Sequence, residues 1–249
     1  MTVRAITFDL WDTVFIDDSD EPKRSALGLK SKPVTRRDLV WKSLQDSDPL
    51  DRSVIDIAYD TTDAAFRQVW YSQNITWTVA QRLSVLLKGL SAKMNDHPFD
   101  QLVRLHEDME LDPMPDLAPG VKQALEILHQ KYKLGVISDA IFSPGRALRN
   151  LLDHYGLLGY FDSFIFSDEI GCAKPTPAVF EAAAKELHVN VNELVHIGDR
   201  PAKDIAGPKA LGAKAILCTV VKDRSGQNIN ADAVCENFLH LPDIINNLK

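Results

Sequence analysis

Short apolar runs alternate with amphipathic stretches through the C-terminal half of the chain. Five runs, each bounded by Gly, Asp or Ser, have the length of buried strands: residues 5–10, 134–138, 164–166, 195–197 and 215–219. Helical spacing predicts helices between them at residues 121–132, 144–155, 177–187 and 203–211. This alternation predicts a parallel, doubly wound α/β sheet with right-handed crossovers.

A long segment without a strand pattern separates the first run from the second. Residues 17–32 are polar and contain Pro, Gly and Ser, which predicts a loop, and helical patterns follow at residues 36–45, 54–72, 78–90 and 99–108. Three prolines in residues 112–120 return the chain to the sheet. We therefore predict an α/β core made of residues 1–15 and 117–249, and a helical cap made of residues 16–116.

Composition narrows the class of protein. The chain has 249 residues, a net charge of -7, 45% hydrophobic residues and no basic tract, which disfavours nucleic acid as a partner. No apolar stretch approaches the roughly 20 residues of a membrane span, and Asp9 interrupts the apolar N-terminus, so neither a membrane nor a signal peptide is expected. The three cysteines form no CxxC pair, which predicts a reducing, cytoplasmic setting. The sequence leaves open whether the protein is a monomer or a homodimer.

Residues suited to chemistry follow four of the predicted strands. They are Asp9 to Thr13 after the first, Ser138 and Asp139 after the second, Lys174 downstream of the third, and Asp199 and Asp204 after the fourth. In a doubly wound sheet the carboxyl ends of the strands meet at one edge, where ligands bind. We therefore expect these side chains to converge on one site.

The segments around these residues resemble the four motifs of the haloacid dehalogenase (HAD) superfamily. The four segments are FDLWDTV, VISDA, AKPTPAVF and IGDRPAKD, in that order along the chain. The order and spacing resemble the branch that carries a helical cap between motifs one and two. The resemblance implies a Rossmann-like core and a phosphohydrolase that uses Mg2+ and acts on a small phosphorylated substrate.

The resemblance also implies roles for individual residues. Asp9 would attack phosphorus and form an aspartyl-phosphate, since a carboxylate needs no base to become a nucleophile. Asp9, Asp199 and the backbone carbonyl of Trp11 would bind Mg2+, which prefers oxygen ligands. Asp204 would lie close by, either as a ligand of the metal or as a partner of one of its ligands. An equally weighted alternative is that Asp204 stabilises the N-terminus of a helix.

Four further residues are expected to contact the phosphoryl group or to order the site. Lys174 would neutralise phosphoryl charge and hold the nucleophile in place. The Ser138 hydroxyl and the Asp139 backbone N–H would donate to phosphate oxygens, whereas Thr13 would order the turn after the nucleophile. For Arg146, Arg200 and Lys203 we favour solvated surface charge over contact with the substrate, and for Trp41, Trp70 and Trp77 we favour burial in the core of the cap over a place on the wall of the pocket.

One residue departs from the family pattern. Trp11 stands where HAD phosphatases carry a second Asp that acts as general acid and base, and Asp12 stands where they usually carry Gly. Either Asp12 takes over the proton transfer, or water acts unaided and substrates with good leaving groups are preferred; general acid–base help is typically worth about 10²–10⁴-fold.

The departure also admits other functions. HAD 2-haloacid dehalogenases lack the second Asp as well, but they need no metal and depart from the GDxxxxD motif that Gly198, Asp199 and Asp204 preserve here. A phosphohydrolase is therefore favoured over a dehalogenase. A third alternative is a module that binds a phosphorylated ligand or a protein with little turnover.

Overall fold

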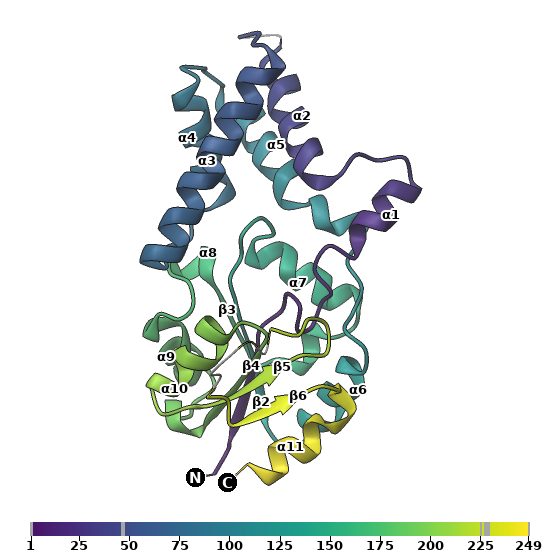
Figure 1. The fold of residues 1–249 in the computed structure, drawn as a ribbon, viewed down its shortest axis with the longest axis vertical. Helices are drawn as coiled ribbons and strands as arrows, with labels where there is room; N and C mark the ends of the chain where they lie inside the picture. The colour runs from purple at the N-terminus through teal and green to yellow at the C-terminus, as the bar shows by residue number, and fades with distance from the viewer. Residues whose placement is uncertain (1, 46–47, 225, 227–229, 249) are drawn as a thin grey trace.

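The chain folds into a six-stranded parallel sheet beneath a stack of helices (Figure 1). The computed structural model describes residues 2–45, 48–224, 226 and 230–248. The strands are β1 (Ala5–Phe8), β2 (Lys133–Ser138), β3 (Ser163–Phe166), β4 (Leu194–Gly198), β5 (Lys214–Cys218) and β6 (Ala233–Cys235), in the order β3-β2-β1-β4-β5-β6. The predicted α/β class is confirmed. β6, a short strand at the edge of the sheet between Asp232 and Glu236, was not among the predicted strands.

Helices cover the sheet on both faces, which explains why its strands are continuous apolar runs. They are α6 (Val121–Leu128), α7 (Gly145–His154), α8 (Ser167–Ile170), α9 (Pro177–Glu186), α10 (Gly207–Ala210) and α11 (Leu241–Asn247). On one face the β1 residues Ile6 and Phe8 share a core with Leu125 of α6. On the other, Ile137 of β2 packs with Phe180 of α9. The site therefore stands on a rigid base.

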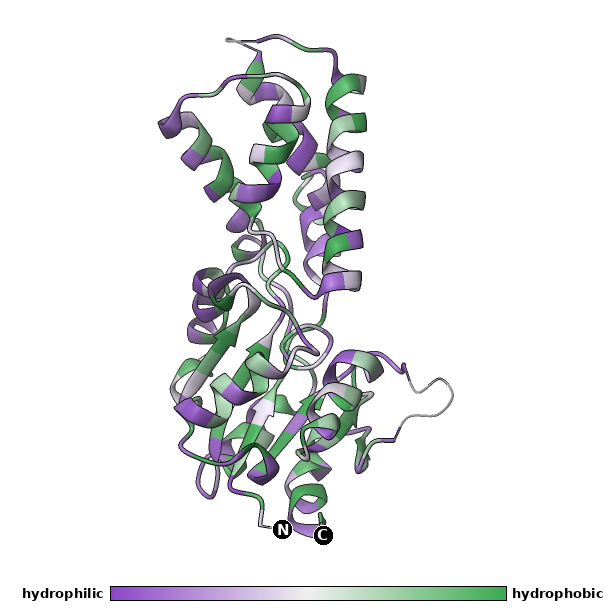
Figure 2. Ribbon diagram, turned by 90° about the vertical axis from the view of Figure 1, so that its left-hand side faces the viewer, coloured by the Kyte–Doolittle hydropathy of each residue, from purple (hydrophilic) through white to green (hydrophobic). Residues whose placement is uncertain are grey.

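Four helices from the segment between β1 and β2 stack beyond the strand ends, away from both termini (Figure 1). They are α2 (Lys32–Leu44), α3 (Arg52–Gln73), α4 (Val79–Gly89) and α5 (Asp96–Glu107). Their apolar faces enclose a separate core that includes Val40, Ile55 and Leu83. Figure 2 shows the basis of this packing, since green and purple residues alternate along the helices of the stack. We refer to residues 16–116 as the cap.

The chain leaves the sheet and returns to it at one place. Phe15 forms a β-bridge with Leu117, and the Ile16 N–H donates to the Asp116 carbonyl at 2.8 Å. The two linkers therefore run side by side between the core and the cap.

The predicted loop at residues 17–32 was wrong in part, because α1 (Asp20–Ala26) forms within it. Acidic residues occupy its first turn and Lys23 and Arg24 its last, as the helix dipole favours. Pro22 stands in the first turn, where a missing N–H breaks no helical hydrogen bond. Among the described residues, no helix is both long and apolar enough to cross a lipid bilayer.

Candidate active site

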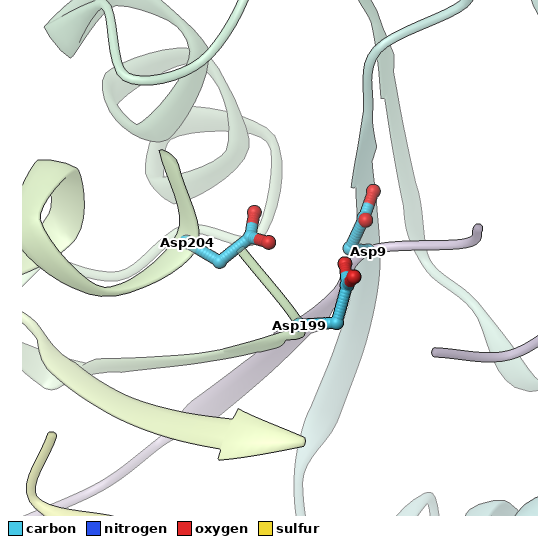
Figure 3. A group of neighbouring side chains, drawn as sticks. All are labelled: Asp9, Asp199 and Asp204. Atoms are coloured by element: carbon cyan, nitrogen blue, oxygen red, sulfur yellow. The ribbon is translucent and has the colours of Figure 1, made fainter. Parts of the chain in front are cut away.

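Three carboxylates meet beyond the ends of β1 and β4. Asp9 follows β1, Asp199 follows β4, and the Asp9 N–H donates to the Ile197 carbonyl at 2.8 Å, which extends the pairing of the two strands to this point. Asp204 comes from the π-helical segment Pro201–Ala206. Each of the three aspartates offers an oxygen within 4.8 Å of the others, and their carboxylates project into a common space (Figure 3). The structure thus brings together the three predicted acids.

Gly198 allows this close approach. A Cβ at Gly198 would lie 2.4 Å from the Asp204 Cγ, much closer than two carbon atoms can pack. The glycine of the fourth motif is therefore required by the position of Asp204 rather than by backbone conformation.

Lys174 is the cation at the centre of the cluster. It is 2% exposed, and its Nζ lies 2.8 Å from Asp9 Oδ1 and 2.7 Å from Asp204 Oδ1. Burial alone would lower the pKa of Lys174, but the charges of Asp204 and Asp9 outweigh it and raise that pKa, so the ammonium stays charged. Burial raises the pKa of Asp9, and Lys174 opposes the increase.

Asp204 is fixed by partners on several sides. Its Oδ2 accepts the Arg200 backbone N–H at 2.8 Å, and its Oδ1 lies 3.2 Å from His196 Nε2. The other ring nitrogen of His196 lies 2.9 Å from the hydroxyl of Thr7. Although burial opposes ionisation, Lys174 and His196 hold the pKa of Asp204 well below its usual range. Asp204 is therefore a buried anion with both oxygens in use.

Asp199 carries negative charge that is only partly compensated. Its Oδ2 accepts from Arg224 Nη1, whereas its Oδ1 is buried without a hydrogen-bond partner among the described residues. Burial, together with Asp9 and Asp204, raises the pKa of Asp199 to about 7. A buried orphan oxygen beside two other carboxylates is the donor set that a hard divalent cation prefers, so these residues fit Mg2+.

The departures from the family pattern lie in the turn after Asp9. Asp12 adopts a left-handed conformation with φ of 55°, which glycine takes freely and Asp tolerates. Its carboxylate accepts from Arg224 Nη2 at 2.9 Å and from the Asp17 N–H at 3.3 Å. Trp11 packs against Phe15 with ring centroids 5.9 Å apart. No signal in the sequence pointed to Arg224, because it lies beyond β5 in a segment without a motif.

The loops after β2 and β3 are joined through Asp139. Its Oδ1 accepts the Lys174 backbone N–H at 3.0 Å, and its Oδ2 pairs with Lys203 Nζ at 2.7 Å. The Asp139 side chain thus orders the segment that carries Lys174, a role that the sequence did not indicate. The hydroxyls of Ser138 and Thr13 are buried and have no hydrogen-bond partner among the described residues.

Two of the three basic residues expected at the surface lie in the site instead. Lys203 is buried, and its Nζ lies 3.4 Å from the ring centre of Trp70. Arg200 is half-buried, with its Cζ 5.6 Å from the same ring. Trp70 is buried as expected but faces this site, because cation–π contacts with the core hold it there. Arg146 is half-buried between Glu107 and Asp108.

A cavity of about 670 Å³ lies between the sheet edge and the cap. Four predicted site residues line it, namely Asp9, Trp11, Asp139 and Lys174. The other five, all within the described part of the chain, do not line it: Asp12, Thr13, Ser138, Asp199 and Asp204. Arg36, Phe66 and Trp70 are among the cap residues on its wall. The volume is ordinary for a small-molecule site.

Comparison with known proteins identifies the family. Residues 3–212 match the family model of haloacid dehalogenase-like hydrolases. A glyceraldehyde 3-phosphate phosphatase of Methanopyrus kandleri is 26% identical over 217 residues, which cover 84% of this chain and 81% of that protein.

Solved structures share the fold. A 2-haloacid dehalogenase from Pseudomonas syringae pv. tomato has a TM-score of 0.67 and 22% identity over 100% of both chains. A HAD phosphatase from Thermococcus onnurineus has a TM-score of 0.64 and 23% identity over 98% of both chains. With the family model matching most of its length, the chain belongs to the haloacid dehalogenase-like hydrolases, as the four motifs predicted, and is an enzyme of the hydrolase class.

Proposed function

We propose that this hydrolase is a magnesium-dependent phosphatase that acts on a small phosphorylated metabolite through an aspartyl-phosphate at Asp9. The buried cluster of Asp9, Asp199 and Asp204 around Lys174 is the observation that carries the proposal. The relative named as a phosphatase matches along most of both chains, which supports the same reaction class.

Asp9, Asp199 and the Trp11 carbonyl would hold Mg2+, with Asp204 as a further ligand or a partner through water. When bound, the ion supplies positive charge that favours ionised carboxylates and a phosphoryl group. The orphan oxygen of Asp199 supports this assignment. Arg224 would share that carboxylate with the ion, because it contacts the other oxygen of Asp199.

In the reaction, an oxygen of Asp9 forms a bond to phosphorus while the bond from phosphorus to the ester oxygen breaks. Lys174 holds Asp9 Oδ1 and faces the cavity, so it orients the nucleophile and stabilises phosphoryl charge. The unpartnered Ser138 hydroxyl and the Asp139 N–H would donate to phosphoryl oxygens. Water then attacks phosphorus, releases phosphate and restores the Asp9 carboxylate.

Proton transfer is the step for which this chain is poorly equipped. The indole of Trp11 neither gives nor takes a proton usefully. Arg224 and the Asp17 N–H occupy the carboxylate of Asp12. We therefore assign the leaving-group proton to water rather than to Asp12. Esters whose alcohols are acidic, such as aryl phosphates, should react faster than alkyl phosphates.

Phosphate release from p-nitrophenyl phosphate and from an alkyl phosphate tests these assignments. We expect turnover that EDTA abolishes, a higher rate with the aryl ester, and loss of activity by more than about 10⁴-fold in Asp9→Asn. A phosphate-sized mass increase on the wild type should be absent from that variant. Asp243→Asn, which changes an exposed acid in α11, should retain full activity. Turnover that survives Asp9→Asn would refute the proposal.

Dehalogenation is the second candidate, favoured by the missing carboxylate at Trp11 and by the fold shared with a dehalogenase. Chloride release from 2-chloropropionate without metal is its test. The retained cluster of Asp199 and Asp204 makes phosphate hydrolysis the better supported reaction.

A further inference from the structure

Arg36 is a buried cap residue whose charge is poorly compensated by its neighbours. It belongs to α2, is 5% exposed and lines the cavity. Its Nε and Nη2 are buried and form no hydrogen bond with any described residue. Oε1 of Glu110 is 4.0 Å from Nη2, which is too far for a hydrogen bond. Glu110 already binds Lys32 Nζ at 3.2 Å and accepts from the Ser143 hydroxyl.

Several other cations on the cavity wall are paired. Arg82 contacts Asp63 and donates to the Ile141 carbonyl at 2.9 Å, and Lys32 lies 2.7 Å from Asp20. Arg37 contacts Asp60. A guanidinium cannot lose its proton in proteins, so a buried one whose N–H groups form no hydrogen bond carries a desolvation cost that a bound anion would offset. Arg36 therefore has N–H groups left to donate to a ligand, whereas Arg82 and Lys32 are already paired with residues of the protein.

The free atoms of Arg36 also define the shape of that anion. Nε and Nη2 lie on one edge of the planar guanidinium, with their N–H bonds nearly parallel. The flat face of the group rests on Phe142, with Cζ 3.5 Å from the ring centre, which fixes the orientation of the fork. Two parallel donors match the two oxygens of a carboxylate, which arginine binds in a bidentate manner.

We propose that the substrate is a phosphate ester of a carboxylic acid, whose carboxylate binds the Nε and Nη2 edge of Arg36 while its phosphate faces Asp9. This inference rests on the proposed function and specifies its substrate class. Arg36 and Lys174 line the same cavity, one on the cap and one on the sheet edge. Phe66 and Trp70 line the same cavity and offer apolar contact to the carbon chain between the two anionic groups.

Matched substrates test the carboxylate directly. We would compare phosphorylated hydroxy acids of two, three and four carbons with their primary amides, which have similar leaving groups but no second charge. In the wild type, kcat/KM for the best acid should exceed that for its amide by about 10- to 100-fold, as expected for a hydrogen-bonded charge pair. Arg36→Gln should remove this preference, and Arg36→Lys should retain part of it. Arg104→Gln, on an exposed arginine of α5, should keep it.

Each outcome decides the inference. Equal kcat/KM for acid and amide in the wild type refutes it, whether or not Arg36→Gln folds, and so does a preference that survives in a folded Arg36→Gln. If no ester is hydrolysed, the phosphatase proposal fails, and calorimetric titration of Asp9→Asn with the same acids and amides still tests the subsite. Tighter binding of the acid would support the Arg36 site, and equal binding would reject it.

Discussion

The two walls of the cavity hold their charges in different ways. On the sheet edge, Lys174 and Asp204 are each bound by residues from other segments, so each charge is fixed by its partners. On the cap, Arg36 is also buried, but its Nε and Nη2 have no hydrogen-bond partner among the described residues. Lys174 and Asp204 are thus paired within the protein, whereas Arg36 keeps two hydrogen-bond donors without a partner among the described residues. This difference agrees with the proposed function, in which the core carries out the reaction and the cap recognises the substrate.

The largest effect should come from breaking the core network. Lys174→Met leaves Asp9 and Asp204 buried without their shared cation, and loss of one partner of a buried ion pair typically costs about 3–5 kcal/mol. Urea unfolding should show this loss, and Mg2+ should restore part of it. Phosphatase activity should fall by about 10²- to 10³-fold or more.

Lys209→Met is the matched control for Lys174→Met. Lys209 pairs with Asp232 at 2.8 Å at a partly exposed position of the same core, where an ion pair contributes up to about 1 kcal/mol. Equal losses of stability in the two variants would contradict the inference that the buried ion pairs of Lys174 stabilise the core.

The sequence predicted the core wall well because its residues are encoded locally. Asp9, Ser138 and Asp199 each stand within one residue of a strand end, so a pattern of apolar runs is enough to place them at one edge. Lys174 and Asp204 lie farther from a strand end, and the resemblance of their segments to the HAD motifs indicated them. The role of the Asp139 side chain was missed, because it depends on Lys203, which is 64 residues away.

The cap wall could not be predicted, because packing between distant segments creates it. Arg36 is one of several basic residues in a polar stretch, and only its burial against Phe142, from the loop after β2, distinguishes it. Lys203 was expected in solvent because nothing near it in the sequence indicates that Trp70 covers it. Arg224 was not predicted either, because it lies 212 residues from Asp12 in the sequence and only the fold brings the two side chains together.

Acid should weaken the cap through His106, which is 1% exposed in α5. Burial, together with the charges of Arg36 and Arg82, lowers the pKa of His106 to about 4, although the hydrogen bond to the Leu102 carbonyl opposes the change. Its pKa in the unfolded chain is near 6.5. The unfolded state therefore binds more protons between these values, so the contribution of neutral His106 is present above pH 6.5 and is lost as the pH falls towards 4.

The expected loss from His106 is up to about 1.4 kcal/mol per pH unit in that window. Comparing wild type with His106→Leu in urea unfolding at pH 7 and pH 5 isolates the contribution of His106 to stability, because the other titrating groups are common to both proteins. The variant should lose about 2 kcal/mol less stability than the wild type over that range. His97→Leu, at an exposed position of the same helix, should behave as the wild type does. A wild type and His106→Leu that lose stability in parallel would show that His106 is not held neutral.

A pair of glycine substitutions should give the smallest changes in stability, with a decrease in the core and an increase in the cap. Gly198→Ala places a methyl group 2.4 Å from Asp204 Cγ in a fully buried site, and such overpacking typically costs about 1–3 kcal/mol. Because the clash falls on Asp204, activity should fall as well. At Gly89, which ends α4, an added methyl group would meet no atom within 4 Å, and Ala at a helical position is favoured by roughly 0.5–1 kcal/mol. Thermal unfolding should therefore shift down for Gly198→Ala and slightly up for Gly89→Ala. A Gly198→Ala protein of normal stability and activity would show that the strand end tolerates movement of Asp204, contrary to a core wall whose charges are fixed.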